Sequence, residues 1–104
     1  MTTSRLLAFC VAYSLAATSP ALAEASYGGG SGASLQTAIT IDADNEMEGV
    51  AAEYDYVKQH LPGWTVASQS VANQNGRSYD VLVIQKGSET RELFFDITAF
   101  FGKM

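Results

Sequence analysis

The sequence predicts an α+β domain in which one helix packs on a three- to four-stranded antiparallel sheet. One stretch, from about residue 45 to 60, repeats its apolar side chains every three or four positions, as a helix does. Three later stretches alternate in the manner of strands, and short turns separate them. A helix beside a meander of strands buries one apolar stripe against one sheet face, which is the two-layer arrangement of an α+β fold.

The first 23 residues have the layout of a signal peptide. Arg5 precedes an apolar run from Leu6 to Ala17, and Ala21 and Ala23 supply the small residues of a cleavage position. The run is shorter than the roughly 20 residues that a membrane span requires. We therefore expect a periplasmic or secreted protein that is cleaved after Ala23 and does not insert into a membrane afterwards. A retained N-terminal anchor is the alternative.

Residues 24–34 are rich in glycine and serine, a composition that predicts a flexible leader. The single domain is then expected over residues 35–104. Its first element is a short edge strand at Leu35–Ile41, where apolar and polar side chains alternate.

Charge and cysteine content exclude several classes of function. Without Arg5, which lies in the signal peptide, five basic residues stand against eleven carboxylates, a formal net charge of −6. That charge opposes binding to nucleic acid and to anionic lipid, because both depend on cationic contacts. The single cysteine, Cys10, also lies in the signal peptide, so the domain is expected to have neither a disulfide nor a cysteine nucleophile. No motif predicts a cofactor.

The predicted helix has recognisable ends. Asp44 or Asn45 is expected at the N-cap, and Glu48 completes a variant of the capping box. Pro62 disfavours the helical conformation of the residue before it, and Gly63 permits a tight exit turn. The helix is therefore expected to end near residue 60.

The apolar periodicity also predicts which side of the helix is buried. Tyr54 and Val57 are expected to pack against the sheet, whereas Glu53 and Lys58 are expected to face water.

Three strands are expected after the helix, at Trp64–Ala72, Arg77–Lys86 and Thr90–Ile97. Asn75 and Gly76 form the turn between the first two. The middle strand carries apolar side chains on both faces, which is typical of an interior strand. We expect Leu82 and Ile84 on one face, Tyr79, Val81 and Val83 on the other, and Leu93, Phe95 and Ile97 pointing inward from the last strand.

One helix covers only one face of a sheet, so the opposite face needs another cover. The expected partner-binding residues are Tyr79, Val81 and Phe94 on that face, with Phe100 and Phe101 in the C-terminal tail. At least one of the two tail phenylalanines is expected to fold back over the edge of the core. A protein partner or a second copy of the chain would supply the remaining cover.

No catalytic residue is predicted. The alternative is a small hydrolase or metal-dependent enzyme that uses Asp80, Asp96 and His60, since paired carboxylates can perform acid–base chemistry. It requires the three side chains to converge in one cleft.

No metal site is predicted either. Asp42, Asp44, Glu46 and Glu53 have the spacing of a calcium-binding loop, but Met47 stands where that loop requires glycine. A capped helix accounts for the same carboxylates, because negative charge is favourable at a helix N-terminus.

The order of these elements resembles the PepSY domain. The matching stretches are Pro62-Gly63-Trp64, Tyr79-Asp80-Val81 and Phe95-Asp96, within residues 46–97. The ending, DITAFFG, departs from the family pattern and is similar to that of small secreted bacterial proteins that close in FDI-x-x-FFGK. The resemblance implies an exported, non-catalytic module that acts in the cell envelope or restrains a peptidase partner.

Overall fold

The computed structural model describes residues 25–104, which form one helix and five strands. The expected signal peptide, residues 1–23, lies outside the described residues. In chain order the elements are β2 (Ser26–Gly29), β3 (Ile39–Asp42), α1 (Glu46–His60), β4 (Thr65–Gln74), β5 (Arg77–Lys86) and β6 (Glu89–Asp96).

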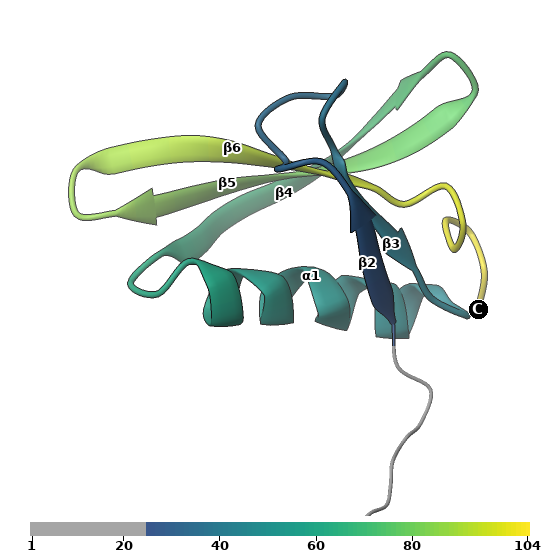
Figure 1. The fold of residues 1–104 in the computed structure, drawn as a ribbon, viewed down its shortest axis with the longest axis horizontal. Helices are drawn as coiled ribbons and strands as arrows, with labels where there is room; N and C mark the ends of the chain where they lie inside the picture. The colour runs from purple at the N-terminus through teal and green to yellow at the C-terminus, as the bar shows by residue number, and fades with distance from the viewer. Residues whose placement is uncertain (1–24) are drawn as a thin grey trace, which may run out of the picture.

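The five strands form one mixed sheet in the order β2-β3-β6-β5-β4, with α1 on one face (Figure 1). The α+β class is as predicted, but the prediction of a three- to four-stranded antiparallel sheet is wrong. Strand β3 does not extend the antiparallel meander; it lies parallel to β6, with Ile39 opposite Phe95. The other neighbouring strands pair antiparallel; tight turns join β4 to β5 and β5 to β6, whereas residues 30–38 connect β2 to β3.

The extra strand, β2, comes from the stretch expected to be a flexible leader. Tyr27 donates a hydrogen bond from its hydroxyl group to the Ala52 carbonyl at 2.7 Å, which ties β2 to the helix. Gly32 accepts a hydrogen bond from the Phe94 N–H at 2.8 Å. Gly32 has a φ of +87°, and an added Cβ would lie 2.7 Å from the Leu93 side chain, so glycine is required there by conformation and by space.

The helix bounds predicted from the sequence are confirmed to within one residue. Asn45 is the N-cap and its side-chain oxygen accepts a hydrogen bond from the Glu48 N–H at 2.9 Å. At the other end the Leu61 N–H donates to the Val57 carbonyl. Gly63, with a φ of +90°, turns the chain directly into β4.

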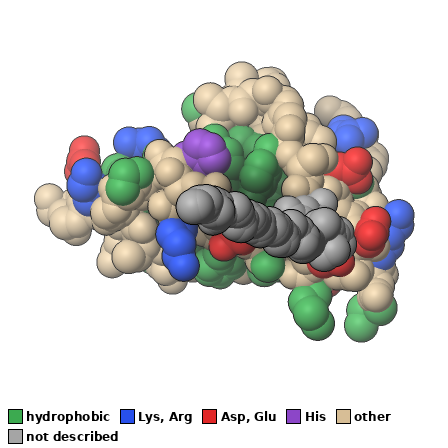
Figure 2. All heavy atoms as spheres, turned by 60° about the horizontal axis from the view of Figure 1, so that its bottom comes forward, with side chains coloured by type: hydrophobic (Ala, Val, Ile, Leu, Met, Phe, Trp, Pro, Cys, Tyr) green, Lys and Arg blue, Asp and Glu red, His purple; other side chains and the backbone are tan. Residues whose placement is uncertain are grey.

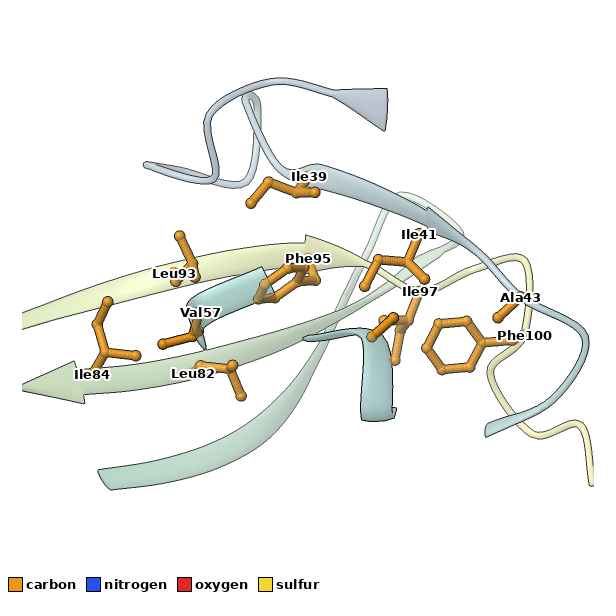
Figure 3. Packing of buried hydrophobic residues seen from close by; sticks show 11 residues of the cluster. Ile39, Ile41, Ala43, Val57, Leu82, Ile84, Leu93, Phe95, Ile97 and Phe100 are labelled. Carbon is orange, nitrogen blue, oxygen red and sulfur yellow. The ribbon is translucent and has the colours of Figure 1, made fainter. Parts of the chain in front are cut away.

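The core lies between α1 and the sheet (Figure 3). The inward faces predicted for the last two strands are confirmed, since their apolar side chains are 0–4 % exposed. The buried set also takes in side chains from β3, the helix and the C-terminal tail, and its largest members are Phe95, Phe100, Ile39, Ile41, Leu82, Ile84 and Ile97.

The buried side of the helix differs in part from the prediction. Val57 is buried and Lys58 is exposed, as expected, but Tyr54 is 42 % exposed and Glu53 is fully buried. The buried side of the helix contains the small residues Gly49 and Ala52, and Glu53 lies on this side with them. Periodicity alone therefore predicted Tyr54 as the buried residue, whereas its neighbour Glu53 is the buried one.

Tyr54→Ala is therefore expected to lower the free energy of unfolding by about 1 kcal/mol or less, because the side chain lies at the surface of the helix, 42 % exposed, and not in the core. Urea unfolding followed by circular dichroism measures it. Val57→Ala, at a buried position on the same helix, is the control and should lose more. A loss of about 3 kcal/mol for Tyr54→Ala would show that the ring is a core residue after all.

Candidate functional site

Strand β4 forms one edge of the sheet, because within the described residues only β5 pairs with it. Its sequence, TVASQSVANQ, contains no charged residue and no proline. Edge strands present unpaired N–H and C=O groups, and natural proteins commonly protect them with charges, proline or bulges. β4 has one such device, a register irregularity between Val66 and Ser68. From Ser68 to Gln74 the strand continues regularly, with an unprotected outer edge.

A groove of about 480 Å³ lies beside the beginning of this edge. One wall is a flank of α1, and the other is formed by the turn after the helix and the first residues of β4. The lining residues are Tyr54, Asp55, Val57, Lys58, Leu61, Pro62, Gly63, Trp64, Thr65 and Val66. Most of this lining is apolar, so the groove suits a hydrophobic side chain.

Trp64, the single tryptophan of the chain, is half-buried at this groove. The Arg91 guanidinium lies over its ring, 4.4 Å from the centroid, a cation–π contact that restrains the ring. Because Trp64 directly precedes β4, the groove and the open edge adjoin each other.

A chain of hydrogen bonds connects the groove to the interior. The Tyr54 hydroxyl donates to Gln69 Oε1 on β4 at 3.1 Å. Gln69 Nε2 then donates to Asp80 Oδ2 on β5 at 3.2 Å. The side chains of the helix flank, the edge strand and the sheet interior are thus held in one arrangement.

Asp80 faces the helix side of the sheet, where it meets the buried Glu53. The exposed fractions of Glu53 and Asp80 are 0 % and 2 %. As ionised groups both carboxylates can only accept hydrogen bonds, and neither Glu53 oxygen has a donor in the described part of the chain. A proton on Glu53 removes this conflict, because Glu53 can then donate to Asp80.

The pKa of Glu53 is accordingly raised to about 10. The largest cause is burial, which disfavours the charged form; the hydrogen bond with Asp80 and the negative charge of Asp80 add to it. Glu53 is therefore a neutral residue of the core at neutral pH, not the solvent-facing carboxylate that the sequence predicted.

The residues predicted to bind a partner do not form one surface. Tyr79 and Val81 lie on the sheet face opposite the helix, each 9 % exposed, and Phe94 beside them is half-buried. Phe100 is buried in the core on the helix side, whereas Phe101 is 45 % exposed. Phe100 is thus unavailable to a partner, and three of the other four offer only limited area.

The three residues of the enzyme alternative are not brought together. Asp80 lies opposite Phe95 in the sheet, whereas Asp96 is one residue further along β6 and points to the other face. His60 stacks on Tyr56 at the end of the helix, with 4.2 Å between ring centroids.

Asp96 is engaged by other groups. Arg77 Nε lies 2.7 Å from Asp96 Oδ2, and the Thr98 hydroxyl donates to Asp96 Oδ1 at 2.6 Å. Burial favours the neutral carboxyl, but the hydrogen bonds from Arg77 and Thr98 outweigh it, and the pKa of Asp96 is lowered. These contacts fasten the end of β6 to β5 and the following turn.

Residues 25–104 hold no group of three or more His, Cys, Asp or Glu side chains that could bind a metal. Glu46, in the first turn of the helix, has a structural contact: it accepts a hydrogen bond from the Gly102 N–H at 2.6 Å. Glu53, the last position of the calcium-loop spacing, is enclosed in the core.

Neither the open edge nor the groove was predicted from the sequence. A local signal was present, since no charged residue occurs between Trp64 and Arg77. That signal needs the strand order to be interpreted, and the order is not visible in local periodicity.

Comparison with models of known families, with curated proteins and with solved structures finds no match to this chain. Among the described residues, no helix combines the length and apolar character needed to cross a membrane.

Proposed function

We propose that this chain is an exported, non-catalytic binding domain that takes up an extended segment of a partner protein as an additional strand along β4. The observation that supports this proposal is the long, uncharged and unprotected edge of that strand. In strand addition the main-chain hydrogen bonds supply affinity, and they require an open edge on a rigid sheet.

The rest of the domain supplies the rigid sheet. β4 pairs with β5 along its whole length, and β5 in turn carries the buried Leu82 and Ile84 of the core. Gln69 fixes β4 further through its bonds to Tyr54 and Asp80.

A non-catalytic role is favoured because Asp80, Asp96 and His60 are engaged in separate structural contacts. A peptidase partner, which the PepSY resemblance implies, remains a prediction. So does an export route that begins with the signal-like residues 1–23, which the structure does not describe.

Amide hydrogen exchange tests strand addition directly. We expect a ten-residue peptide of alternating lysine and valine to slow exchange at every second amide from Ser68 to Gln74 by at least tenfold at saturation. The matched control is the same peptide with alternate backbone nitrogens methylated, which cannot complete the hydrogen-bond ladder. Exchange that is unchanged along β4, or slowed equally by the methylated peptide, would rule out strand addition at this edge.

A further inference from the structure

The geometry of the β4 edge determines where the side chains of an added strand would lie. Successive side chains of a strand point to opposite faces of the sheet, so every second one would lie on the helix side. On that side β4 itself presents Val66, Gln69 and Val71, whose partners on β5 are Ile84, Leu82 and Asp80. The helix-side residues of an added strand therefore run along this row.

The row offers two apolar contacts separated by the polar Gln69. At its beginning Val66 and Trp64 line the groove against the flank of α1. Further along, Val71 is 48 % exposed at the edge, although it is a large hydrophobic residue. Apolar side chains at alternate positions of a ligand would cover Val71 and fill the groove.

The charge of the chain favours a basic ligand. The formal net charge is −5 at pH 7, and Figure 2 shows acidic side chains gathered toward the end of the helix-bearing face where α1 begins. Two of the basic residues are already engaged, Arg77 with Asp96 and Arg91 with Trp64. β4 carries no charge, and the groove is lined by one acidic and one basic residue, Asp55 and Lys58, so the net charge of the chain decides the sign of the attraction. The electrostatic field of the negatively charged protein attracts a cationic segment. It repels a second copy of the chain, which carries the same negative charge.

We propose that the ligand is a basic, extended polypeptide segment with apolar side chains at alternate positions, held along β4 with one apolar side chain in the groove against Trp64. This inference rests on the proposed function and adds to it the chemistry of the partner.

Because Trp64 is the only tryptophan, its fluorescence reports occupancy of the groove. Three ten-residue peptides separate the contributions: alternating lysine and valine, alternating lysine and threonine, and alternating glutamate and valine. The lysine–valine peptide is expected to shift the Trp64 emission and to bind at least fivefold more tightly than either of the others. Its affinity should fall as salt is added, because the attraction is electrostatic over a long range.

Tyr54→Ala removes one aromatic side chain from the helix wall of the groove. It is expected to weaken binding of the lysine–valine peptide at least fivefold and to leave the lysine–threonine peptide unchanged. Tyr54→Phe keeps the ring and loses only the hydroxyl bonded to Gln69, so its affinity should stay within twofold. Met47→Ala is the matched control, since Met47 is an 82 % exposed apolar residue on the same helix outside the groove.

The outcomes separate the inference from the proposed function. All three peptides could slow amide exchange along β4 with equal affinity and without changing the Trp64 emission. In that case the proposed basic and apolar character of the ligand is wrong, and strand addition stands. If none of them affects β4, both proposals fail. If the protein alone forms a dimer whose population rises with salt and whose β4 amides are protected, the occupant is a second copy and the inference is overturned.

Discussion

Glu53→Gln is expected to stabilise the domain, by about 2 kcal/mol at pH 7 and by more at pH 9. The wild-type glutamate is ionised in the unfolded chain but must take up a proton in the folded core, where its pKa is raised to about 10. Each pH unit above the unfolded pKa adds up to about 1.4 kcal/mol to the cost of that uptake. Glutamine has nearly the same shape, needs no proton, and can donate an N–H to Asp80.

The direction of the pH dependence follows from the raised pKa. The contribution of Glu53 to stability is fully present below its unfolded pKa of about 4.5 and is lost as the pH rises toward about 10. Asp96 acts oppositely: its lowered pKa gives stability that is present at neutral pH and lost as the pH falls through the folded-state value. The difference between wild type and Glu53→Gln removes the shared Asp96 effect.

Urea unfolding at pH 5, 7 and 9 measures this difference. Glu92→Gln is the control, because it makes the same chemical change at an exposed position of β6 and should stay within about 0.5 kcal/mol of wild type. A stability difference between Glu53→Gln and wild type that does not grow from pH 5 to pH 9 would show that Glu53 is not protonated in the folded state.

The buried pair also matters for the edge of the sheet. Asp80 meets Glu53 on one side and accepts a hydrogen bond from Gln69 of β4 on the other. The polar contacts of the core therefore reach the strand that we propose as the binding edge. A neutral Glu53 lets Asp80 serve both neighbours without two adjacent charges in the core.

Local patterns predicted those parts of the fold that local forces decide. The helix ends follow from the Asn45 cap and the Pro62–Gly63 turn, both of which are short-range effects. Alternation in β5 and β6 identified their buried faces correctly, because a strand face is set by a period of two.

Long-range pairing decided what the sequence could not show. Ile39 and Phe95 lie opposite each other in neighbouring parallel strands although they are far apart in the chain. The glycine-rich segment has too few side chains to display alternation, yet its backbone pairs with β3 as β2. The candidate site could not be predicted for the same reason. β4 is an edge because β2 and β3 extend the sheet beside β6 and not beside β4.

Phe100→Ala is expected to lower the free energy of unfolding by about 3–5 kcal/mol, the range for aromatic truncation in a core. The Phe100 ring is 1 % exposed and lies beside Ala43 and Ile97 (Figure 3). It packs directly on the backbone of α1 at Gly49, where an added Cβ would overlap the ring. The loss is a large part of the total stability of a small domain, which is about 5–15 kcal/mol.

Phe101→Ala makes the same change one residue later, where the ring is 45 % exposed, and should lose about 1 kcal/mol or less. Urea unfolding monitored by circular dichroism compares the two variants. Should Phe100→Ala not fold at all, Gly49→Ala provides an independent measurement, because its methyl group must displace the same ring and is expected to cost about 1–3 kcal/mol. A larger loss for Phe101→Ala than for Phe100→Ala, or a neutral Gly49→Ala, would show that the C-terminal tail does not close the core in this way. With the predicted order of losses, the part of the tail that holds Phe100 is a structural cover for the start of α1.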